Sequence, residues 1–337
     1  MTEQSSTTLH LSADMTTTGM TQITGGNTTI SSPKLVATLY FHCALIVIGV
    51  VGTATNGLIL YALVASKQHK KQVLIVNQNA LDLFTSVMMV VCHSLKLHNI
   101  DFTGSAGYWL CTLLYSDGLF WCGINGSVIN LACITVDRYL KVVHSAWSKN
   151  RVKNWMIYSA MAFSWIGSFI YNAALVFPTS AVIDATCYVY TIFESEAAKI
   201  FFIFFNFVSF YVLTLLIFIF CYWRILVIIR RQAKVMAGHA AAGPSTSQTY
   251  AQAQSNKIQS NIIKTMILVS ALYAIMWLPN NILLLIFTLS KSPPASAFYA
   301  SVILAFLYMC INPFIYAVNF DPVKEVLLRL IPCKNSG

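Results

Sequence analysis

Seven long apolar segments, separated by short polar stretches, dominate the sequence. Each is close to or longer than the ~20 residues that a helix needs to cross the ~30 Å hydrocarbon layer of a membrane. Backbone polar groups in lipid need internal partners, and these segments lack the alternation of barrel strands, so we expect helices. The segments are residues 35–66, 72–95, 118–136, 154–183, 200–223, 265–290 and 292–320, and Asp82 is the one Asp, Glu, Lys or Arg residue inside them. Residues 35–320 therefore form one predicted membrane domain.

The composition supports this interpretation, because 57% of the residues are hydrophobic and 9% are charged, whereas soluble domains carry about 25% charge. If the N-terminus is extracellular, all but four of the 21 Lys and Arg residues fall on the cytoplasmic side, as the positive-inside rule requires. The exceptions are Lys34, Lys96, Lys199 and Lys291. The net charge of +10 therefore predicts an orientation, with the C-terminus in the cytoplasm, and does not require a nucleic-acid partner.

The polar stretches at and between the segments predict less ordered parts. Residues 1–34 are rich in Ser and Thr and are expected to form a disordered extracellular tail, with Asn27 in a glycosylation sequon. Residues 234–256 are rich in Ala, Gly, Ser and Gln and predict a flexible third inner loop. Residues 321–337 predict a short amphipathic helix and a cytoplasmic tail, with Cys333 as a candidate palmitoylation site.

Polar residues inside the apolar segments are candidates for function. Asp82 lies near the middle of the second segment, and a lone carboxylate at that depth marks a functional site by default, although a purely structural buried acid stays open. In the third segment Asp117, Phe120, Ser127 and Arg138 are spaced by threes and fours. As one continuous helix the segment would turn all four side chains toward the bundle interior.

Three short motifs lie in the third, sixth and seventh segments: D-R-Y at 137–139, W-L-P at 277–279 and N-P-x-x-Y at 312–316. Further single residues in the first, second and fourth segments complete the set, namely Asn56, Asp82 and Trp165. In this order the residues resemble the rhodopsin-like (class A) G-protein-coupled receptors, over about residues 35–333. The resemblance implies an all-α membrane protein, a seven-transmembrane helix bundle with a short amphipathic eighth helix.

The resemblance also assigns roles to individual residues. It implies a G-protein coupling switch made of Asp137, Arg138, Tyr139, Tyr222, Asn312, Pro313 and Tyr316. It implies an allosteric sodium site at Asp82, Ser127 and Asn312. It implies a disulfide between Cys111 and Cys187, which are the cysteines on the extracellular side of the predicted spans. It implies a ligand pocket lined by Asp117, Phe120, Asn206, Trp277, Asn280, Asn281 and Phe306.

Three positions depart from the family pattern. Cys111 precedes Arg138 by 27 residues, two more than expected, which predicts a looser turn above the third helix. The fifth segment has Thr214 where the family usually has proline, which puts a bulge there in doubt. Gln259 replaces an acid that in some members restrains the D-R-Y arginine, and this predicts appreciable ligand-free activity with Arg138 held by Asp137 in the resting state.

We therefore expect a plasma-membrane receptor that converts binding of an extracellular ligand into activation of a heterotrimeric G protein, with receptor kinase, arrestin and membrane lipid as further partners. Phe120 stands where amine receptors carry an aspartate, so a typical monoamine is disfavoured. An excess of acidic residues on the outer side favours a basic peptide or other cation. Asp117 would be its anchor, unless it pairs with Lys96 or is simply hydrated. The alternative ligand is a lipid or a neutral small molecule.

Other protein classes fit the sequence less well. An opsin would need a lysine in the seventh segment, where residues 292–320 contain none and Phe306 aligns with that position, so no retinal is expected. A membrane transporter would show internal repeats and paired broken helices. A membrane metalloenzyme would need clustered His and acidic residues, and no two His residues are spaced by four. We do not expect an enzyme.

Overall fold

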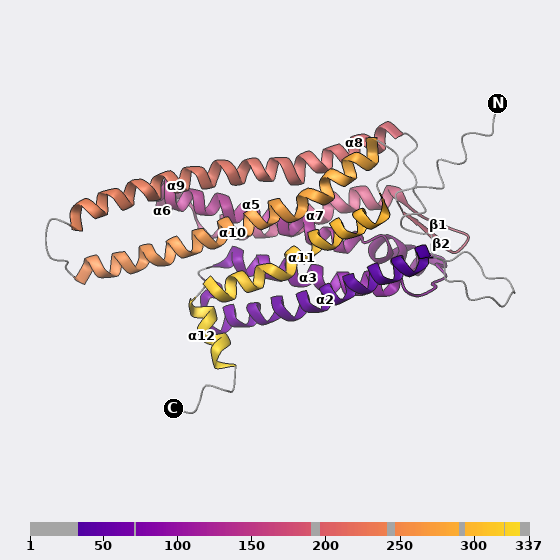
Figure 1. Cartoon of the computed structure of the whole chain (residues 1–337), viewed down its shortest axis with the longest axis horizontal. Helices are drawn as coiled ribbons and strands as arrows, with labels where there is room; N and C mark the ends of the chain where they lie inside the picture. The colour runs from indigo at the N-terminus through magenta and orange to yellow at the C-terminus, as the bar shows by residue number, and fades with distance from the viewer. Residues whose placement is uncertain are drawn as a thin grey trace.

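The structure is a computed structural model that describes residues 33–70, 72–189, 196–240, 247–289, 294–319 and 321–330. The predictions for the N-terminal tail, Asn27 and Cys333 lie outside the described residues. Elongated helices run side by side along the longest dimension of the molecule, with the β-strands at one end and the short helix α12 toward the other (Figure 1). These two ends are called the hairpin end and the α12 end below.

Seven helices are long and apolar enough to cross a membrane, which confirms the predicted seven-helix bundle. The helices that make up the spans are α2 (Pro33–Ala65), α3 (Val73–Leu95), α5 (Gly118–Val143), α7 (Asn154–Thr179), α9 (Leu213–Ala240), α10 (Ser247–Leu289) and α11 (Ala295–Asn319). The shorter helical elements are η1 (Gln68–Lys70), α4 (Gly104–Leu110), η2 (Cys111–Tyr115), α6 (Ser145–Arg151), α8 (Glu196–Asn206), η3 (Phe207–Val212) and α12 (Asp321–Arg329). The predicted eighth helix corresponds to α12.

Helix α5 is the element around which the others are arranged, since it packs against α3, α7 and α9. Small residues make this close packing feasible, because helices in lipid associate through tight van der Waals contact. A Cβ atom added at Gly126 would lie 2.9 Å from a Leu81 methyl carbon and 2.9 Å from the Ser164 carbonyl oxygen. At this point only a glycine lets α5 fit between α3 and α7.

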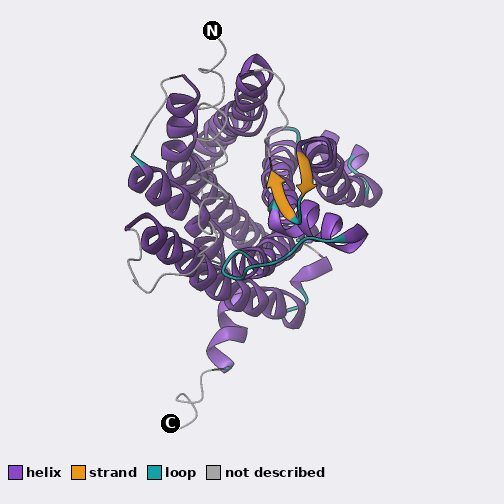
Figure 2. Ribbon diagram, turned by 90° about the vertical axis from the view of Figure 1, so that its right-hand side faces the viewer, coloured by secondary structure: helices purple, strands orange, loops and turns teal. Residues whose placement is uncertain are grey.

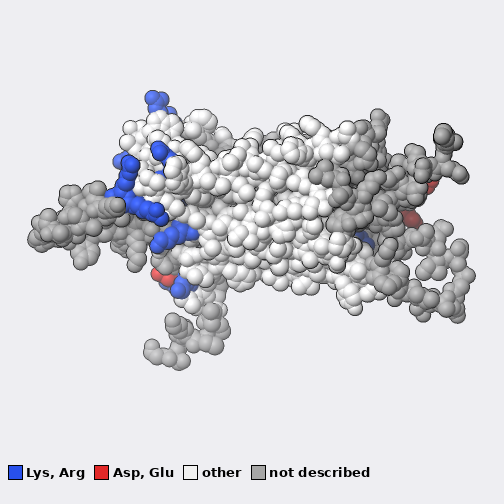
Figure 3. Space-filling model, turned by 45° about the horizontal axis from the view of Figure 1, so that its top comes forward, with Lys and Arg blue, Asp and Glu red and all other residues white. Residues whose placement is uncertain are grey.

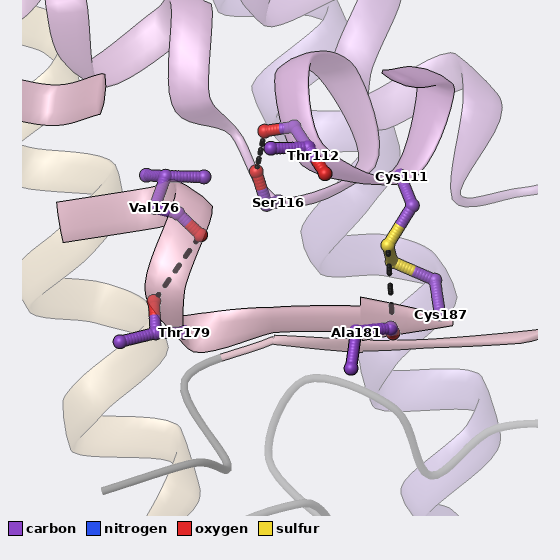
Figure 4. The surroundings of a disulfide bond; sticks show 7 residues. All are labelled: Cys111, Thr112, Ser116, Val176, Thr179, Ala181 and Cys187. Atoms are coloured by element: carbon purple, nitrogen blue, oxygen red, sulfur yellow. Dashed lines mark hydrogen bonds between the residues drawn. A yellow bond between two sulfur atoms is a disulfide. The ribbon is translucent and has the colours of Figure 1, made fainter. Parts of the chain in front are cut away.

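A two-stranded antiparallel hairpin lies across one end of the bundle (Figure 2). It consists of β1 (Ser180–Ile183) and β2 (Thr186–Val189), and it begins where α7 ends. The predicted fourth helix, residues 154–183, was therefore too long by the whole first strand. The predicted disulfide is present: Cys187 of β2 bonds to Cys111, and both cysteines are buried (Figure 4).

The predicted looseness above the third helix takes a definite form. The five residues of η2 form a π-helix, and Asp117 has a left-handed backbone with φ of 60°. A π-turn holds more residues per turn than an α-helix, so η2 and this kink absorb the two extra residues before Arg138. Gly118 follows because a Cβ there would lie 2.8 Å from the Thr112 carbonyl oxygen. The helix α5 therefore begins at Gly118, and Asp117 is its N-cap and not part of its face.

The fifth span contains a wide turn although the family proline is absent. Residues Phe207–Val212 form the π-helix η3, which ends two residues before Thr214. Two reciprocal hydrogen bonds join this turn to α10: the Tyr211 hydroxyl donates to the Ala274 carbonyl at 2.8 Å, and the Tyr273 hydroxyl donates to the Phe210 carbonyl at 2.6 Å. The doubt raised by Thr214 was misplaced, because cross-helix hydrogen bonds accompany the wide turn here without a proline.

The ends of α9 and α10 extend into the range predicted as a flexible inner loop. Helix α9 continues to Ala240 and α10 begins at Ser247, so of residues 234–256 only 241–246 lie outside the described helices. Ala and Gln, which are common in this stretch, are good helix formers. The helical propensity of these residues accounts for the difference.

Replacing Cys111 or Cys187 with Ser should lower the melting temperature of the purified receptor by about 3–6 °C. The bridge joins residues 76 positions apart, and such bridges contribute ~2–4 kcal/mol. At an unfolding entropy of ~2.1 cal/mol/K per residue, 1 kcal/mol corresponds to ~1.4 °C in a chain of 337 residues. The double variant should have the same melting temperature as the single variants, because each single variant already removes the bridge. Cys43→Ser, at an exposed free thiol, is the control. Losses that add in the double variant would contradict the pairing.

Candidate functional site

A buried carboxylate occupies the centre of the bundle. The Asp82 side chain, on α3, is 0% exposed, and it forms no ion pair with any described Lys or Arg. Neutral donors satisfy it instead. The Ser127 hydroxyl of α5 donates to Oδ1 at 2.6 Å, and the Asn312 amide of α11 donates to Oδ2 at 3.2 Å. The structure therefore brings together the three residues of the predicted sodium site, which come from three helices.

A fourth residue, Gln78, also binds this carboxylate. It lies one turn before Asp82 on α3 and is fully buried. Its Nε2 lies 3.3 Å from Oδ1 and 3.4 Å from Oδ2 of Asp82, and it also donates to Ser127. One N–H of Gln78 is given to Ser127, so the other is shared between the two oxygens of Asp82. The carboxylate therefore accepts three hydrogen bonds, from Ser127, Asn312 and Gln78, of the about four that its lone pairs allow.

The other end of the Gln78 amide connects this site to a longer polar network. Gln78 Oε1 accepts a hydrogen bond from Asn130 at 2.8 Å, and Asn130 also donates to the Leu74 carbonyl at 2.9 Å. Asn77 donates to Asn130 Oδ1 at 2.9 Å and accepts from Trp165 Nε1 at 2.8 Å. One chain of hydrogen bonds therefore runs from Trp165 on α7 through α3 and α5 to α11. Since each amide proton has an acceptor, the network fixes how Gln78 is oriented.

The donor set is suited in part to a sodium ion. Asp82 and Ser127 supply hard oxygen atoms, which are the ligands that such cations prefer. Asn312 adds its Oδ1, which is buried and accepts no hydrogen bond from the described residues. Gln78 works against this fit, because it presents an N–H group, and not an oxygen, to both carboxylate oxygens.

The D-R-Y motif lies at the α12 end of α5. Arg138 donates from its terminal nitrogen to Gln72 Oε1 at 2.5 Å, whereas its Nε is 3.8 Å from the Asp137 carboxylate. The same Asp137 oxygen lies 2.8 Å from Lys141 Nζ. The predicted Arg138–Asp137 contact is thus present but long, and Gln72 holds the arginine more closely. The side chain of Gln259 is outside the described residues, so its effect on basal activity stays a prediction.

Other residues of the family pattern, among them further predicted switch residues, make contacts within the bundle. The Tyr222 hydroxyl of α9 lies 3.0 Å from the Thr135 hydroxyl and 3.2 Å from the Ser270 hydroxyl, which links α9 to α5 and α10. Asn56 donates to the Met309 carbonyl at 3.2 Å and so ties α2 to α11. Tyr316, with Pro313 one turn before it on α11, is buried. Tyr139 is half-buried and lies 3.2 Å from His144 Nε2.

At the hairpin end, Asp117 pairs with Lys96, which follows the last residue of α3. The two side chains are 20% and 10% exposed. Of the three possibilities that the sequence left open for Asp117, namely ligand anchor, ion pair with Lys96 and hydration, the structure has the ion pair. Asp117 Oδ1 is buried and accepts no hydrogen bond from the described residues, so half of the carboxylate remains unsatisfied.

Below this ion pair an aromatic cluster joins α5, α10 and α11. The Phe120 and Phe306 rings are 4.9 Å apart and edge to face, and Trp277 lies 6.1 Å from Phe306. Asn280 accepts from Ser301 at 3.4 Å, and Asn281 donates to the Trp277 carbonyl at 2.9 Å. Asn206 is not part of this group, because its Oδ1 accepts from Tyr171 of α7 at 2.7 Å.

Sequence reasoning overlooked several residues of these clusters. Gln78 lies four residues before Asp82 and Asn130 lies three after Ser127, so helical spacing would have placed both beside the carboxylate. Gln72 could not be found in this way, because it lies before the first residue of α3. His42 and His93, with Nδ1 atoms 3.0 Å apart, are 51 positions apart in the sequence and give no signal there.

Comparison with known proteins decides the family. The family model of the 7 transmembrane receptor (rhodopsin family) matches residues 55–316. The chain belongs to this family. The residues with which it resembles the family lie on the helices where the family motifs are expected, and the family consists of receptors rather than enzymes. This receptor is therefore a G-protein-coupled, multi-pass membrane protein of the rhodopsin-like class.

Individual relatives are distant. The receptor is 24% identical to the C-C chemokine receptor type 8 of Mus musculus over 304 residues, which is 85% of this chain and 77% of that protein. It is 24% identical to the adenosine receptor A3 of Ovis aries over 212 residues, which is 61% of this chain and 64% of that protein. The crystal structure of squid rhodopsin is similar in fold, with a TM-score of 0.70, 20% identity and coverage of 87% and 85% of the two chains. The names of these relatives refer to different ligands, so they do not identify the ligand class of this receptor.

Replacing Gln72 with Leu should raise ligand-independent G-protein activation by about tenfold or more. The variant removes the acceptor that holds Arg138, a hydrogen bond to a charged group contributes ~1.5–3 kcal/mol, and 1.4 kcal/mol is tenfold in an equilibrium. Guanine-nucleotide exchange in membranes, at matched surface expression, measures the effect. Gln68→Leu, in the turn before α3, is the control. Unchanged basal exchange in Gln72→Leu would show that this contact does not restrain the resting state.

Proposed function

We propose that this receptor recognises an extracellular ligand carrying a cationic group, such as a basic peptide, and that Asp117 receives that group. The observation that carries the proposal is the half-satisfied Asp117 carboxylate at the hairpin end. Exposed Asp101 and Asp184 lie at the same end, and acidic groups around a binding site steer cations toward it. Phe120, Trp277 and Phe306 form an apolar floor below.

The ion pair with Lys96 shapes this proposal. A cationic ligand would have to displace the Lys96 ammonium from Asp117, and the lysine would then return to water. Part of the ligand's interaction energy is lost in this exchange. Lys96 therefore competes with the ligand for Asp117. The ligand must gain correspondingly more binding free energy from its other contacts. An anionic ligand would instead bind Lys96 and displace Asp117 from it. A lipid or neutral ligand would bind neither charge.

In this proposal the hairpin end is extracellular and the α12 end is cytoplasmic, at the plasma membrane. The supporting feature is the distribution of charge, since Lys and Arg side chains gather at the α12 end (Figure 3). Ligand binding then shifts a two-state packing equilibrium of the helices toward the state that activates the heterotrimeric G protein. Receptor kinase and arrestin are proposed as further partners at the α12 end.

We also propose that Asp82, Ser127 and Asn312 hold a sodium ion in the resting state. Bound there, the ion supplies a positive charge to a buried carboxylate. Because it favours the resting state, it lowers agonist affinity by linkage. Gln78 must withdraw its N–H group from Asp82 for this to happen, so we expect sodium to bind more weakly than it would without that residue.

Asp117→Asn should lower the potency of a cationic agonist about tenfold or more, whereas Lys96→Gln should raise it. Removing one partner of a desolvated charge pair costs ~2–5 kcal/mol, and displacement of Lys96 offsets part of this. Screening peptide, amine and lipid libraries on both variants identifies the ligand class. The double variant Lys96→Gln/Asp117→Asn controls for folding and expression. Potency that shifts in neither variant would exclude Asp117 as the anchor and favour a neutral ligand.

Gln78→Leu should lower the sodium concentration that half-stabilises the purified receptor by about tenfold. The hydrogen bond from Gln78 to Asp82, shared between both carboxylate oxygens, is worth ~0.5–1.5 kcal/mol net, and 1.4 kcal/mol is tenfold. Melting temperature is measured in sodium chloride against N-methylglucamine chloride at equal ionic strength. Asp82→Asn should abolish the response in both backgrounds. A response that is equal with and without Gln78 would show that this residue does not compete with the ion.

A further inference from the structure

A polar cavity of about 430 Å³ lies at the α12 end, beside the contact between Arg138 and Gln72. Its walls come from the starts of α3 and α7, the foot of α5, and the short helix α6. The volume falls in the range of small-molecule sites, roughly 300–1,000 Å³. The cavity is therefore large enough for a multi-atom ligand group and not only for a few water molecules.

The charges that line this cavity are strongly unbalanced. Its lining contains four cationic side chains and one carboxylate, namely Lys70, Arg138, Lys141 and Lys149, and Asp137. The carboxylate is already bound to Lys141 at 2.8 Å, and Arg138 is bound to Gln72. Lys70 and Lys149 are exposed and form no ion pair with any described residue. Two cations from different elements, Lys70 of η1 and Lys149 of α6, are thus available for an anion.

Neutral donors on the same walls suit phosphate oxygens. Ser145, Asn154 and Tyr158 line the cavity together with the cations. Hydroxyl and amide groups supplement lysine and arginine in recognising phosphate, because its oxygens accept several hydrogen bonds at once. The lining as a whole matches a group with more than one phosphate better than a single monovalent anion.

The location of the cavity favours a lipid as the source of that group. Trp155 and Tyr158, in the first turns of α7, are 63% and 52% exposed, and such aromatic side chains mark the level of lipid headgroups. One of them, Tyr158, also lines the cavity. The cavity therefore lies at the level of the headgroups, so a lipid headgroup can reach it while the acyl chains stay in the bilayer.

We propose that this cavity binds the phosphorylated inositol headgroup of an inner-leaflet lipid, with Lys70 and Lys149 as its principal charge partners. Basic pockets between helices on the cytoplasmic side are suited to such headgroups. The proposal rests on the cytoplasmic orientation of the α12 end given under the proposed function. It does not depend on the ligand or on G-protein coupling, so the two can fail separately.

The experiment uses the full-length receptor in nanodiscs of phosphatidylcholine containing a small fraction of phosphatidylinositol 4,5-bisphosphate. A second set contains enough phosphatidylserine to give the same surface charge. Binding is measured with a headgroup-labelled lipid by energy transfer to a dye on the receptor. The wild-type receptor should bind the inositol lipid and discriminate against phosphatidylserine.

Lys70→Gln/Lys149→Gln should weaken inositol-lipid binding by at least about 30-fold, by the combined loss of two basic contacts. The control Arg151→Gln/Lys153→Gln removes the same charge from exposed neighbours that do not line the cavity. It should weaken binding threefold or less, as expected for long-range attraction alone. All four substitutions are at exposed side chains, and equal melting temperatures verify that the variants fold.

Two outcomes would overturn the proposal. Equal losses in the two double variants would mean that the lipid is attracted by the basic surface in general and not by this cavity. Competition by soluble inositol 1,4,5-trisphosphate at concentrations as low as those of the lipid would mean that the site takes a free phosphate compound. Binding that is strong, lipid-dependent and lost only in the Lys70/Lys149 variant supports it.

Discussion

A carboxylate buried in an apolar bundle is the constraint on which the centre of this receptor depends. A charge at this depth costs several kcal/mol unless its environment compensates it. Asp82 has no cationic partner among the described residues, so Ser127, Asn312 and Gln78 must satisfy it together. These donors come from α5, α11 and α3 itself. Because no single helix could supply them, the relative placement of the three helices is tied to one side chain.

A second constraint acts at the hairpin end. The disulfide fixes Cys111 to β2, while the foot of α5 fixes Arg138, and two extra residues must be accommodated between them. They are absorbed by the π-turn and by the left-handed backbone of Asp117. This kink places Asp117 outside the regular helix, where it meets Lys96. The ion pair thus accompanies the longer spacing that was visible in the sequence.

The sequence predicts those features that depend on long runs of residues. The seven spans follow from apolar length, and the disulfide follows from the compartment and the family resemblance. The hairpin could not be predicted, because residues 180–183 continue the apolar run of the fourth span and nothing in their polarity marks a strand. Asp117 was expected on the inner face of an unbroken third helix. The π-helix η2 and the left-handed backbone of Asp117 interrupt that helix.

Side-chain partners were less predictable than positions. The predicted sodium-site residues do meet, yet the competing Gln78 was overlooked, although it is separated from Asp82 by one helical turn. The predicted partner of Arg138 was its sequence neighbour Asp137, but Gln72 binds it more closely, since α3 begins beside the foot of α5. Asn206 was predicted to line the ligand pocket, but its side chain accepts a hydrogen bond from Tyr171 of α7 instead. Such choices depend on tertiary packing that a single sequence does not reveal.

The two functional networks of the bundle meet at the beginning of α3. Asn130 of α5, which orients Gln78 beside Asp82, also donates to the carbonyl of Leu74. Arg138 of the same helix binds Gln72, two residues before Leu74. A shift of the α5 foot away from α3 would strain both contacts together, because the two acceptors, Gln72 and Leu74, lie two residues apart at the beginning of α3. Polar contacts of this kind have discrete arrangements rather than continuous ones, so this turn is a physical link through which the state of the buried carboxylate and the position of Arg138 can depend on each other.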